Sequence, residues 1–380
     1  MNTPSSNPYI DNKKPHVIRW IEWLEYIVPE WKTAICLTGM RPSWQLHLGH
    51  YVWALENWLK IQDMARIKCQ FLIADYHVMW DQDDMEKIRR NIYEVVKDWL
   101  AVGLDPEKSD FILQSALPEG AELMMFFMNL LPIGELERNP TLKAEMRQLI
   151  AKGWEDAAKI SDDDYQTRRW WVSAWFYNYP VSQAADILLP KWTIVPVGDD
   201  QIPHIELTRE IVRLFNNRYG TTFEPPYALI SKVSRLSGID GQAKMSKSLG
   251  NAIMLADDAD TVARKVKKMY TDPTRLKATD PWNTEWNVVF MHLDAFHKDT
   301  AYVEGLKELY RKGEIGDWEL KRIATELLNA FLQPIREKRK LYDHDDAYLR
   351  EVLQKWTNNA REIAERTMLE VRKKIGIIQL

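Results

Sequence analysis

The chain has 380 residues, of which 46% are hydrophobic and 28% charged, and its net charge at pH 7 is −4. A chain of this size and composition buries a sizeable core, ordinarily in two or more domains, so disordered and collagen-like classes of protein are excluded. The chain has 51 basic and 55 acidic residues, so we expect no positive electrostatic field over the whole chain. Any contact with nucleic acid must therefore depend on a local basic patch.

Cysteine usage and the lack of long apolar runs predict the compartment. Cys36 and Cys69 are too few for a disulfide framework or a cysteine-based zinc site, and both stand in apolar runs where we expect them to pack. The N-terminal stretch is polar, and uncharged apolar residues never continue for the roughly 18 positions that a membrane helix needs. We therefore expect a cytoplasmic protein with no membrane partner.

The pattern along the chain first predicts an N-terminal extension, then a sheet. Residues 1–33 form the extension, with a tryptophan-rich amphipathic stretch at 17–28. A short apolar run at 34–37 is followed by helical spacing at 48–61, which is typical of strand, loop and helix. Further apolar runs and helical stretches alternate at 69–74, 85–102, 111–113, 193–197 and 203–217. This alternation predicts an α/β fold with a doubly wound parallel sheet over residues 34–252.

The remaining residues, 253–380, are predicted to be helical only. The last predicted helix, 346–374, has an apolar face that includes Leu349, Leu353 and Ala360. Its position remains open, either within the helical region or packed back on the sheet. Basic residues outnumber acidic ones from 331 onward, so this end of the chain is a candidate for a local basic patch.

A first candidate site straddles the loop after the first strand. Thr-Gly-Met-Arg-Pro-Ser at 38–43 is followed by Leu-His-Leu-Gly-His at 46–50, where a helix begins. A helix N-terminus binds polyphosphate readily, and His47 and His50 share one face of its first turn. Taken alone, this pattern is more often two partly buried histidines that cap a helix. A metal site is less favoured, since no third ligand stands at a recognisable spacing.

A second candidate site is the small-residue loop Gly-Gln-Ala-Lys-Met-Ser-Lys-Ser-Leu-Gly at 241–250. Its two lysines, Lys244 and Lys247, can place mobile ammonium groups against a phosphate. Taken alone, such a segment is more often a solvated basic loop.

The two motifs together resemble the signature sequences of class I aminoacyl-tRNA synthetases. Five further stretches resemble bacterial tryptophanyl-tRNA synthetases: 134–138, 179–180, 184–188, 195–201 and 204–209. The resemblance implies a Rossmann-like catalytic domain at 34–252 and a helical region at 253–380 that binds the tRNA anticodon. It also implies ATP with Mg²⁺, L-tryptophan and tRNA(Trp) as substrates and partners, and a homodimer.

The same resemblance implies roles for individual residues. The catalytic residues would be His47, His50, Lys244 and Lys247. The ATP-binding residues would be Arg41, Pro42, Ser43, Gly49, His50, Gly198, Asp199, Asp200, Lys244, Met245, Ser246, Lys247 and Ser248. Tryptophan would contact Leu37, His77, Tyr179, Gln183, Asp186, Val195, Val197 and Gln201, with no protein-bound metal.

Asp186 is the residue that implies tryptophan rather than tyrosine. In the family this aspartate accepts the indole N–H, and an unpaired buried N–H costs about 1–3 kcal/mol. The alternative interpretation of Asp186 is a helix-capping carboxylate. Gln183 and Leu37 replace a frequent methionine and a frequent phenylalanine, which leaves the tightness of the pocket open.

An excess of tryptophan accompanies a shortage of glycine. The chain has 17 Trp and 15 Gly, whereas average glycine usage would give about 27. Five tryptophans stand where the family pattern has glycine: Trp44, Trp53, Trp175, Trp282 and Trp286. Because all five changes share one direction, we hypothesise that UGA codons for glycine were read as tryptophan. The alternative is that these tryptophans are genuine and crowd the nucleotide site.

The function that the resemblance implies is tryptophan–tRNA ligase activity. A second possibility is a synthetase-like paralogue that binds tryptophan without charging tRNA. Trp44 favours it, and the presence of Lys244 and Lys247 argues against it. A third is an adenylyltransferase of the same superfamily, against which the anticodon-side helical region argues.

Overall fold

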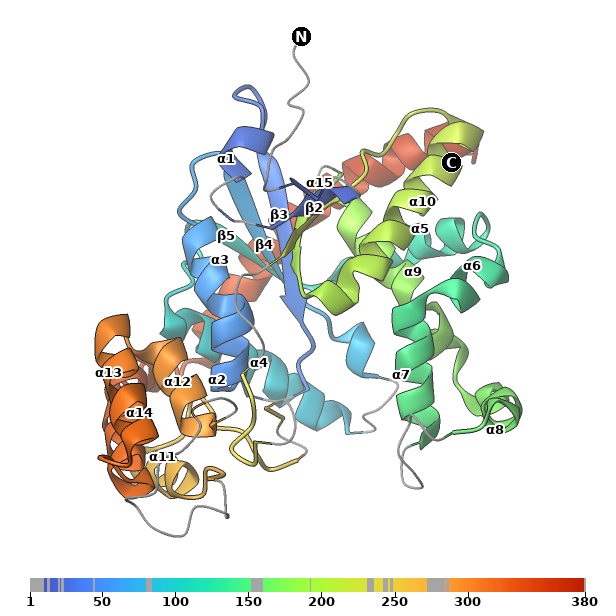
Figure 1. Ribbon diagram of the computed structural model, residues 1–380. Helices are drawn as coiled ribbons and strands as arrows, with labels where there is room; N and C mark the ends of the chain where they lie inside the picture. Colours follow the sequence, from blue (N-terminus) through green and yellow to red (C-terminus); the bar gives the residue numbers. More distant parts are fainter. Residues whose placement is uncertain are drawn as a thin grey trace.

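The computed structural model describes residues 10–11, 14–19, 21, 24–43, 45–79, 84–151, 160–191, 193–230, 236–241, 245–246, 249–271, 284 and 287–378. In this part of the chain, seven strands form one sheet in the order β1-β2-β7-β6-β3-β4-β5 (Figure 1). They are β1 (Ile10–Asp11), β2 (Lys14–Ile18), β3 (Ala34–Met40), β4 (Ile67–Ile73), β5 (Ser109–Leu113), β6 (Thr193–Val197) and β7 (Tyr227–Ile230). β1 is antiparallel to β2, and all other neighbours are parallel. The predicted fold class is confirmed.

The four apolar runs of the sequence coincide with β3, β4, β5 and β6, whereas β2 and β7 were not predicted. The structure divides the amphipathic stretch at 17–28 between the end of β2 and the short helix α1 (Leu24–Ile27). β2 has 5 residues and β7 has 4, which is too short for periodicity to distinguish a strand from a loop. The boundary at residue 34 stays a prediction, although β2 joins the sheet before it.

Side chains alternate along each strand and therefore enter two different cores. On β3, Cys36 belongs to the core shared with α3 (Glu56–Ile61), α4 (Met85–Val102) and the helices after residue 258. Leu37 points to the opposite core, which includes residues of α5 (Pro118–Met128), α9 (Ala174–Leu188) and α10 (Ile202–Tyr219). Cys36 and Cys69 are paired in register on β3 and β4. Both are buried and form no disulfide, which agrees with the prediction that they pack in the core.

The helix predicted at 48–61 is interrupted by a wider turn. It begins as α2 (Leu48–His50), continues as the π-helical turn η2 (Tyr51–Leu55) and ends as α3. Such π turns occur often at functional sites. The other predicted helices correspond to α4, α10 and α15 (Asp346–Ile375). No helix was predicted at α5, α6 (Ile133–Arg138), α7 (Pro140–Ala151), α8 (Asp162–Arg168) or α9.

The C-terminal helices lie in two places. α11 (Ala259–Lys267), α12 (Val288–Phe296), α13 (Thr300–Lys312) and α14 (Asp317–Lys340) gather at one side of the molecule (Figure 1). α15 (Asp346–Ile375) instead packs against β5 and α5, and Thr357 Oγ1 accepts a 3.1 Å hydrogen bond from Leu113 N. Among the described helices, none is long and apolar enough to cross a lipid bilayer.

Candidate active site

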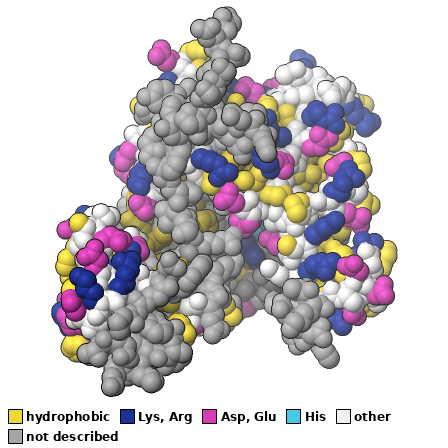
Figure 2. Space-filling view, in the orientation of Figure 1, with side chains coloured by type: hydrophobic (Ala, Val, Ile, Leu, Met, Phe, Trp, Pro, Cys, Tyr) yellow, Lys and Arg dark blue, Asp and Glu magenta, His cyan; other side chains and the backbone are white. Residues whose placement is uncertain are grey.

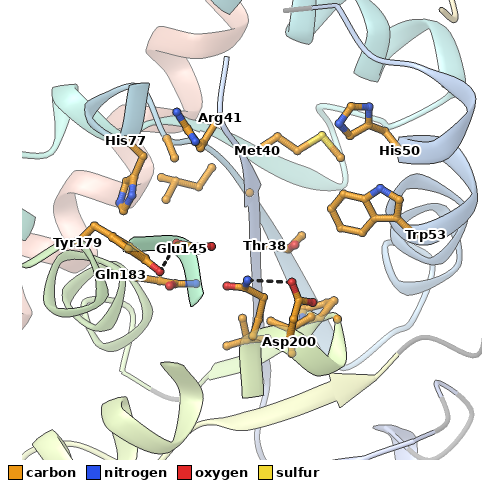
Figure 3. Close-up of a pocket in the computed structure, with 18 of the residues that line it drawn as sticks. Thr38, Met40, Arg41, His50, Trp53, His77, Glu145, Tyr179, Gln183 and Asp200 are labelled. Atoms are coloured by element: carbon orange, nitrogen blue, oxygen red, sulfur yellow. Dashed lines mark hydrogen bonds between the residues drawn. The ribbon is translucent and has the colours of Figure 1, made fainter. Parts of the chain in front are cut away.

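A cavity of about 1020 Å³ opens at the carboxyl ends of β3 and β6, where ligands bind in doubly wound sheets (Figure 3). Its wall includes all eight residues implied for tryptophan: Leu37, His77, Tyr179, Gln183, Asp186, Val195, Val197 and Gln201. It also includes most of those implied for ATP and catalysis: Arg41, His47, Gly49, His50, Gly198, Asp199, Asp200 and Met245. Pro42, Ser43 and Ser246 do not line it. Lys244, Lys247 and Ser248 lie outside the described residues.

One end of the cavity holds a carboxylate in apolar surroundings. Asp186, on α9, has a side chain that is 14% exposed, and burial raises its pKa. Gln114 Nε2 donates to Asp186 Oδ2 over 2.7 Å, and His77 Nε2 lies 3.8 Å from the same oxygen. Leu37 and Val195 supply apolar wall nearby. The arrangement suits a flat apolar group that carries one hydrogen-bond donor.

Two polar side chains, Glu145 on α7 and His204 on α10, contact the hydroxyl of Tyr179. This hydroxyl donates to Glu145 Oε2 over 2.6 Å (Figure 3). The same hydroxyl lies 2.9 Å from His204 Nε2. Burial lowers the pKa of His204 to about 4, so this imidazole is neutral near pH 7. Burial and the neighbouring Glu145 raise the pKa of Tyr179, which keeps its hydroxyl protonated. Glu145 was not predicted from the sequence. In the structure it lines the cavity together with Gln148 and Leu149, which lie on the same face of α7.

The two histidines of the first motif stand at the opposite end of the cavity. His47 is the N-cap of α2, and its backbone N–H donates to His50 Nδ1 over 3.2 Å. The two rings are 3.8 Å apart between centroids. At this turn His50 N donates to His47 O over 2.8 Å, and the two imidazole rings line the cavity together with Gly49. The π turn that follows places Trp53 beside them (Figure 3).

Backbone pairing brings the second motif to the first. Leu48 N donates to Ile253 O and Leu255 N donates to Leu46 O, both over 2.9 Å. Met245, within the second motif, is 5% exposed and packs beside Gly49. A Cβ atom on Gly49 would lie 3.0 Å from the His47 ring and 3.4 Å from Met245 Cβ, so this position favours glycine. Two segments about 200 residues apart in sequence therefore form one wall.

Asp200 belongs to the turn η7 (Asp199–Gln201), directly after β6. A Cβ atom on Gly198 would lie 2.6 Å from Asp200 Oδ1, so glycine permits the carboxylate to fold over the turn. Gln201 Nε2 donates to Asp200 Oδ2 over 3.3 Å, and Thr141 Oγ1 donates to Asp200 O over 2.6 Å. The turn thus presents polar side chains to the cavity.

Two of the five tryptophans in question are described, and both lie at the cavity or next to it. Trp53 is 38% exposed, lines the cavity and has its ring 5.9 Å from that of His50. Trp175, on α9, packs 5.8 Å from the His77 ring, and its buried indole N–H finds no hydrogen-bond partner among the described residues. Trp44, Trp282 and Trp286 lie outside these residues. Trp99, which is not one of the five, also has a buried indole N–H with no hydrogen-bond partner among the described residues, so this feature does not distinguish a misread glycine.

Comparison with known proteins identifies the family. Residues 31–333 match the family described as tRNA synthetases class I (W and Y). The chain is 46% identical over 347 residues to the tryptophan–tRNA ligase of Clostridium longisporum, which covers 90% of this chain and 97% of that protein. The chain belongs to the tryptophan–tRNA ligase family.

Other members of the tryptophan–tRNA ligase family agree in sequence and in fold. The ligase of Streptococcus pyogenes serotype M3 (strain MGAS315) is 45% identical over 350 residues, covering 90% of this chain and 98% of that protein. The solved structure of tryptophanyl-tRNA synthetase from Campylobacter jejuni, complexed with ADP and tryptophan, matches with a TM-score of 0.76 at 34% identity. That match covers 90% of this chain and 100% of the other. The family resemblance is confirmed, and the roles of single residues stay predictions.

Proposed function

We propose that the chain activates L-tryptophan with ATP to tryptophanyl-adenylate and pyrophosphate, and then transfers the tryptophanyl group to the terminal ribose of tRNA(Trp). One observation carries this proposal. A single cavity has a buried acceptor for an indole N–H, Asp186, at one end and a helix start with His47 and His50 at the other. Such a cavity accommodates an aromatic amino acid and a nucleotide end to end.

In this mechanism the protein supplies position and charge rather than a covalent intermediate. The tryptophan carboxylate attacks the α-phosphorus in line, an acyl–phosphate bond forms, and pyrophosphate leaves with the electrons of the broken P–O bond. His47 and His50 contact the phosphates, and Asp200 holds the ribose. Tyr179 and Gln201 hold the α-amino group, which then lies near the Glu145 carboxylate that accepts from Tyr179.

Magnesium is proposed to enter with ATP. Among the described residues, no three His, Cys, Asp or Glu side chains gather closely enough to hold a metal ion. Phosphate oxygens and water are the ligands that Mg²⁺ prefers, so the triphosphate would supply its coordination.

Tryptophan-dependent exchange of pyrophosphate into ATP tests this function, because it needs the pocket, the ATP site and the chemistry together. We expect exchange with tryptophan and little with tyrosine. Tryptophan binding without exchange would favour the non-charging paralogue instead. Exchange without charging of tRNA(Trp) would confine the function to amino-acid activation.

Removing the indole of Trp53 should strengthen ATP binding in protein made with the printed sequence. In Trp53→Gly, we expect the affinity for ATP to rise about tenfold, roughly 1.4 kcal/mol, because the ring no longer occupies space beside His50. Adding Trp44→Gly should increase the gain. Equilibrium dialysis with labelled ATP measures the affinity.

The matched control is Trp318→Gly, which removes an exposed indole on α14, away from the cavity. It should leave ATP affinity unchanged. Equal affinities for Trp53→Gly and the parent would show that the indole does not obstruct the nucleotide. TGA codons at the five positions would support the misreading hypothesis, and TGG codons would refute it.

The tRNA is proposed to bind a local basic surface, and the protein is proposed to act as a cytoplasmic homodimer. Figure 2 shows Lys and Arg interspersed with Asp and Glu on the visible face, in keeping with the small net charge. At the end of α15, the candidate basic patch consists of Arg372, Lys373 and Lys374. Arg372 is bound to Glu122 on α5 and is therefore less available to a phosphate, whereas Lys373 and Lys374 are exposed.

Reversing these two charges should weaken tRNA charging selectively. In Lys373→Glu with Lys374→Glu, we expect charging to fall several-fold and its salt dependence to become shallower, while pyrophosphate exchange stays normal. The measurement is charging rate against salt concentration. A comparison variant, Lys267→Glu with Lys268→Glu, changes exposed lysines at the end of α11. If only that variant loses charging, the tRNA surface lies on α11–α14 instead.

A further inference from the structure

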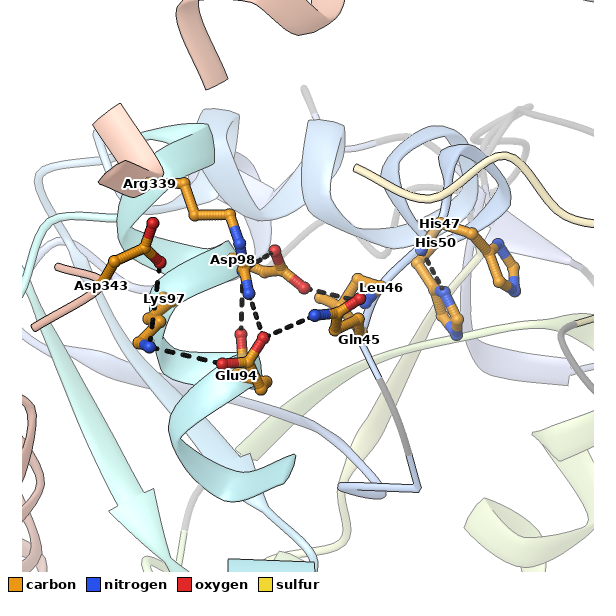
Figure 4. A network of polar contacts seen from close by, with 9 residues as sticks. All are labelled: Gln45, Leu46, His47, His50, Glu94, Lys97, Asp98, Arg339 and Asp343. Atoms are coloured by element: carbon orange, nitrogen blue, oxygen red, sulfur yellow. Dashed lines mark hydrogen bonds and ion pairs between the residues drawn. The ribbon is translucent and has the colours of Figure 1, made fainter. Parts of the chain in front are cut away.

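One face of α4 is joined by hydrogen bonds to the loop that precedes the first motif (Figure 4). Asn91 Nδ2 donates to Ser43 O over 3.0 Å, and Glu94 Oε2 accepts from Gln45 Nε2 over 2.7 Å. One turn further along the helix, Asp98 Oδ2 accepts from Leu46 N over 2.8 Å. The last of these bonds is buried and ends one residue before His47.

The charge that balances this face comes from a distant part of the chain. Arg339, in the last turn of α14, donates to Asp98 Oδ1 and to Glu94 Oε2. Arg339 is 7% exposed and Asp98 is completely buried. Lys97 Nζ also belongs to this group, because it lies 3.3 Å from Glu94 Oε1 and 3.9 Å from Asp343 Oδ1.

Balanced charges are a condition for keeping such a group buried. Burial raises the pKa of Asp98 to about 6, and Arg339 opposes that rise. Loss of Arg339 alone would leave an excess negative charge in the core, which typically destabilises a protein strongly. The charges of Asp98 and Glu94, by contrast, are balanced by those of Arg339 and Lys97, and the third acid, Asp343, has a side chain that is 44% exposed.

We propose that Asp98 is a positioning residue for adenylate formation, which holds the Leu46 backbone N–H and thereby the His47 turn, and that Arg339 keeps Asp98 in place from α14. This inference rests on the proposed function. The Leu46 carbonyl accepts from Leu255 N, His47 N donates to His50 Nδ1, and Leu48 N donates to Ile253 O. With the hydrogen bond from Leu46 N to Asp98, the backbone of the residues that precede α2 is held at each of these positions.

The position of a phosphate-binding turn affects rate strongly, because a displacement of about 1 Å can cost on the order of 100-fold. Asp98 lies behind the loop and does not line the cavity. Its loss should therefore slow the chemical step without weakening the binding of tryptophan. A residue that only supports folding would not separate these two quantities.

Two double variants with the same charge distinguish these possibilities. Asp98→Asn with Arg339→Met keeps a side-chain oxygen for Leu46 N–H, whereas Asp98→Leu with Arg339→Met has a side chain of the same branching and number of heavy atoms but no acceptor. Both remove one negative and one positive charge, and apolar replacement of a buried ion pair is often tolerated. The measurements are the single-turnover rate of adenylate formation at saturating ATP, the tryptophan Kd and hydrogen–deuterium exchange of residues 45–50.

We expect the asparagine variant to stay within about threefold of the parent and the leucine variant to fall about tenfold or more, with an unchanged tryptophan Kd. Residues 45–50 should exchange faster in the leucine variant only. Equal rates and equal exchange in the two variants would overturn the proposal. If the parent forms no adenylate, the proposed function fails, and the exchange difference still decides whether Asp98 holds the turn.

Arg372→Met is the control for a general loosening of the C-terminal helices. Arg372 also joins a C-terminal helix to the catalytic half, through Glu122, but does not approach the first motif. Adenylate formation should be unchanged in this variant. A loss equal to that of the leucine variant would show that any missing tie between the two halves slows the reaction, and would overturn the specific role of Asp98.

Discussion

Replacing Asp186 with asparagine should lower kcat/KM for tryptophan activation by about 5- to 150-fold, which corresponds to roughly 1–3 kcal/mol for one unpaired buried donor. The amide that replaces the carboxylate has only one acceptor oxygen. Gln114 Nε2 already donates to one oxygen of Asp186, so the asparagine would turn its NH₂ group toward the indole N–H or toward Gln114. The measurement is tryptophan-dependent pyrophosphate exchange over a range of tryptophan concentrations.

Asp110→Asn is a matched control for this variant. Asp110 is also a buried aspartate that accepts from a glutamine, since Gln70 Nε2 lies 3.2 Å from its Oδ2. The same oxygen pairs with Lys68 Nζ over 2.8 Å, and Asp110 does not line the cavity. This control should keep normal exchange kinetics. Normal tryptophan activation by Asp186→Asn would refute the assignment of Asp186 to the indole N–H.

Alanine at Lys244 or at Lys247 should lower the first-order rate of adenylate formation about 10²-fold or more, with a smaller change in half-saturating ATP. Charge on the leaving pyrophosphate grows in the transition state, so a mobile ammonium group contributes most there. Neither lysine is among the described residues, but Lys244 directly precedes Met245 and Lys247 directly follows Ser246. Met245 packs beside Gly49, and Ser246 N donates to Asn251 Oδ1 over 2.7 Å, which anchors the segment near the cavity.

Lys267→Ala, at the exposed end of α11, removes a lysine of the same half of the chain and should leave the rate unchanged. Rapid-quench measurement of adenylate at several ATP concentrations separates rate from affinity. If the lysine variants change only the half-saturating ATP concentration, the loop binds ground-state ATP and does not act in the transition state.

The sequence alone was sufficient to predict four of the strands, several helices and the two motifs, because these features depend on residues that are close together in the chain. The apolar runs of β3, β4, β5 and β6 and the helical spacing of α4, α10 and α15 are visible because neighbouring residues share a periodic environment. The two motifs were likewise recognisable, since a helix start and a small-residue loop each occupy a few consecutive residues. Their family resemblance also indicated the residues that line the cavity.

Only the tertiary structure decided how distant side chains meet. Gln114 reaches Asp186 across 72 positions, Glu145 reaches Tyr179 across 34, and Arg339 reaches Asp98 across 241. No periodicity in a single sequence records such pairs, because each partner has an ordinary local context. The same reason explains β2 and β7, whose short segments become strands only when parallel neighbours satisfy their backbone groups. The helical spacing at 48–61 likewise could not reveal the π turn, because only the backbone hydrogen-bond pattern distinguishes it from an α-helix.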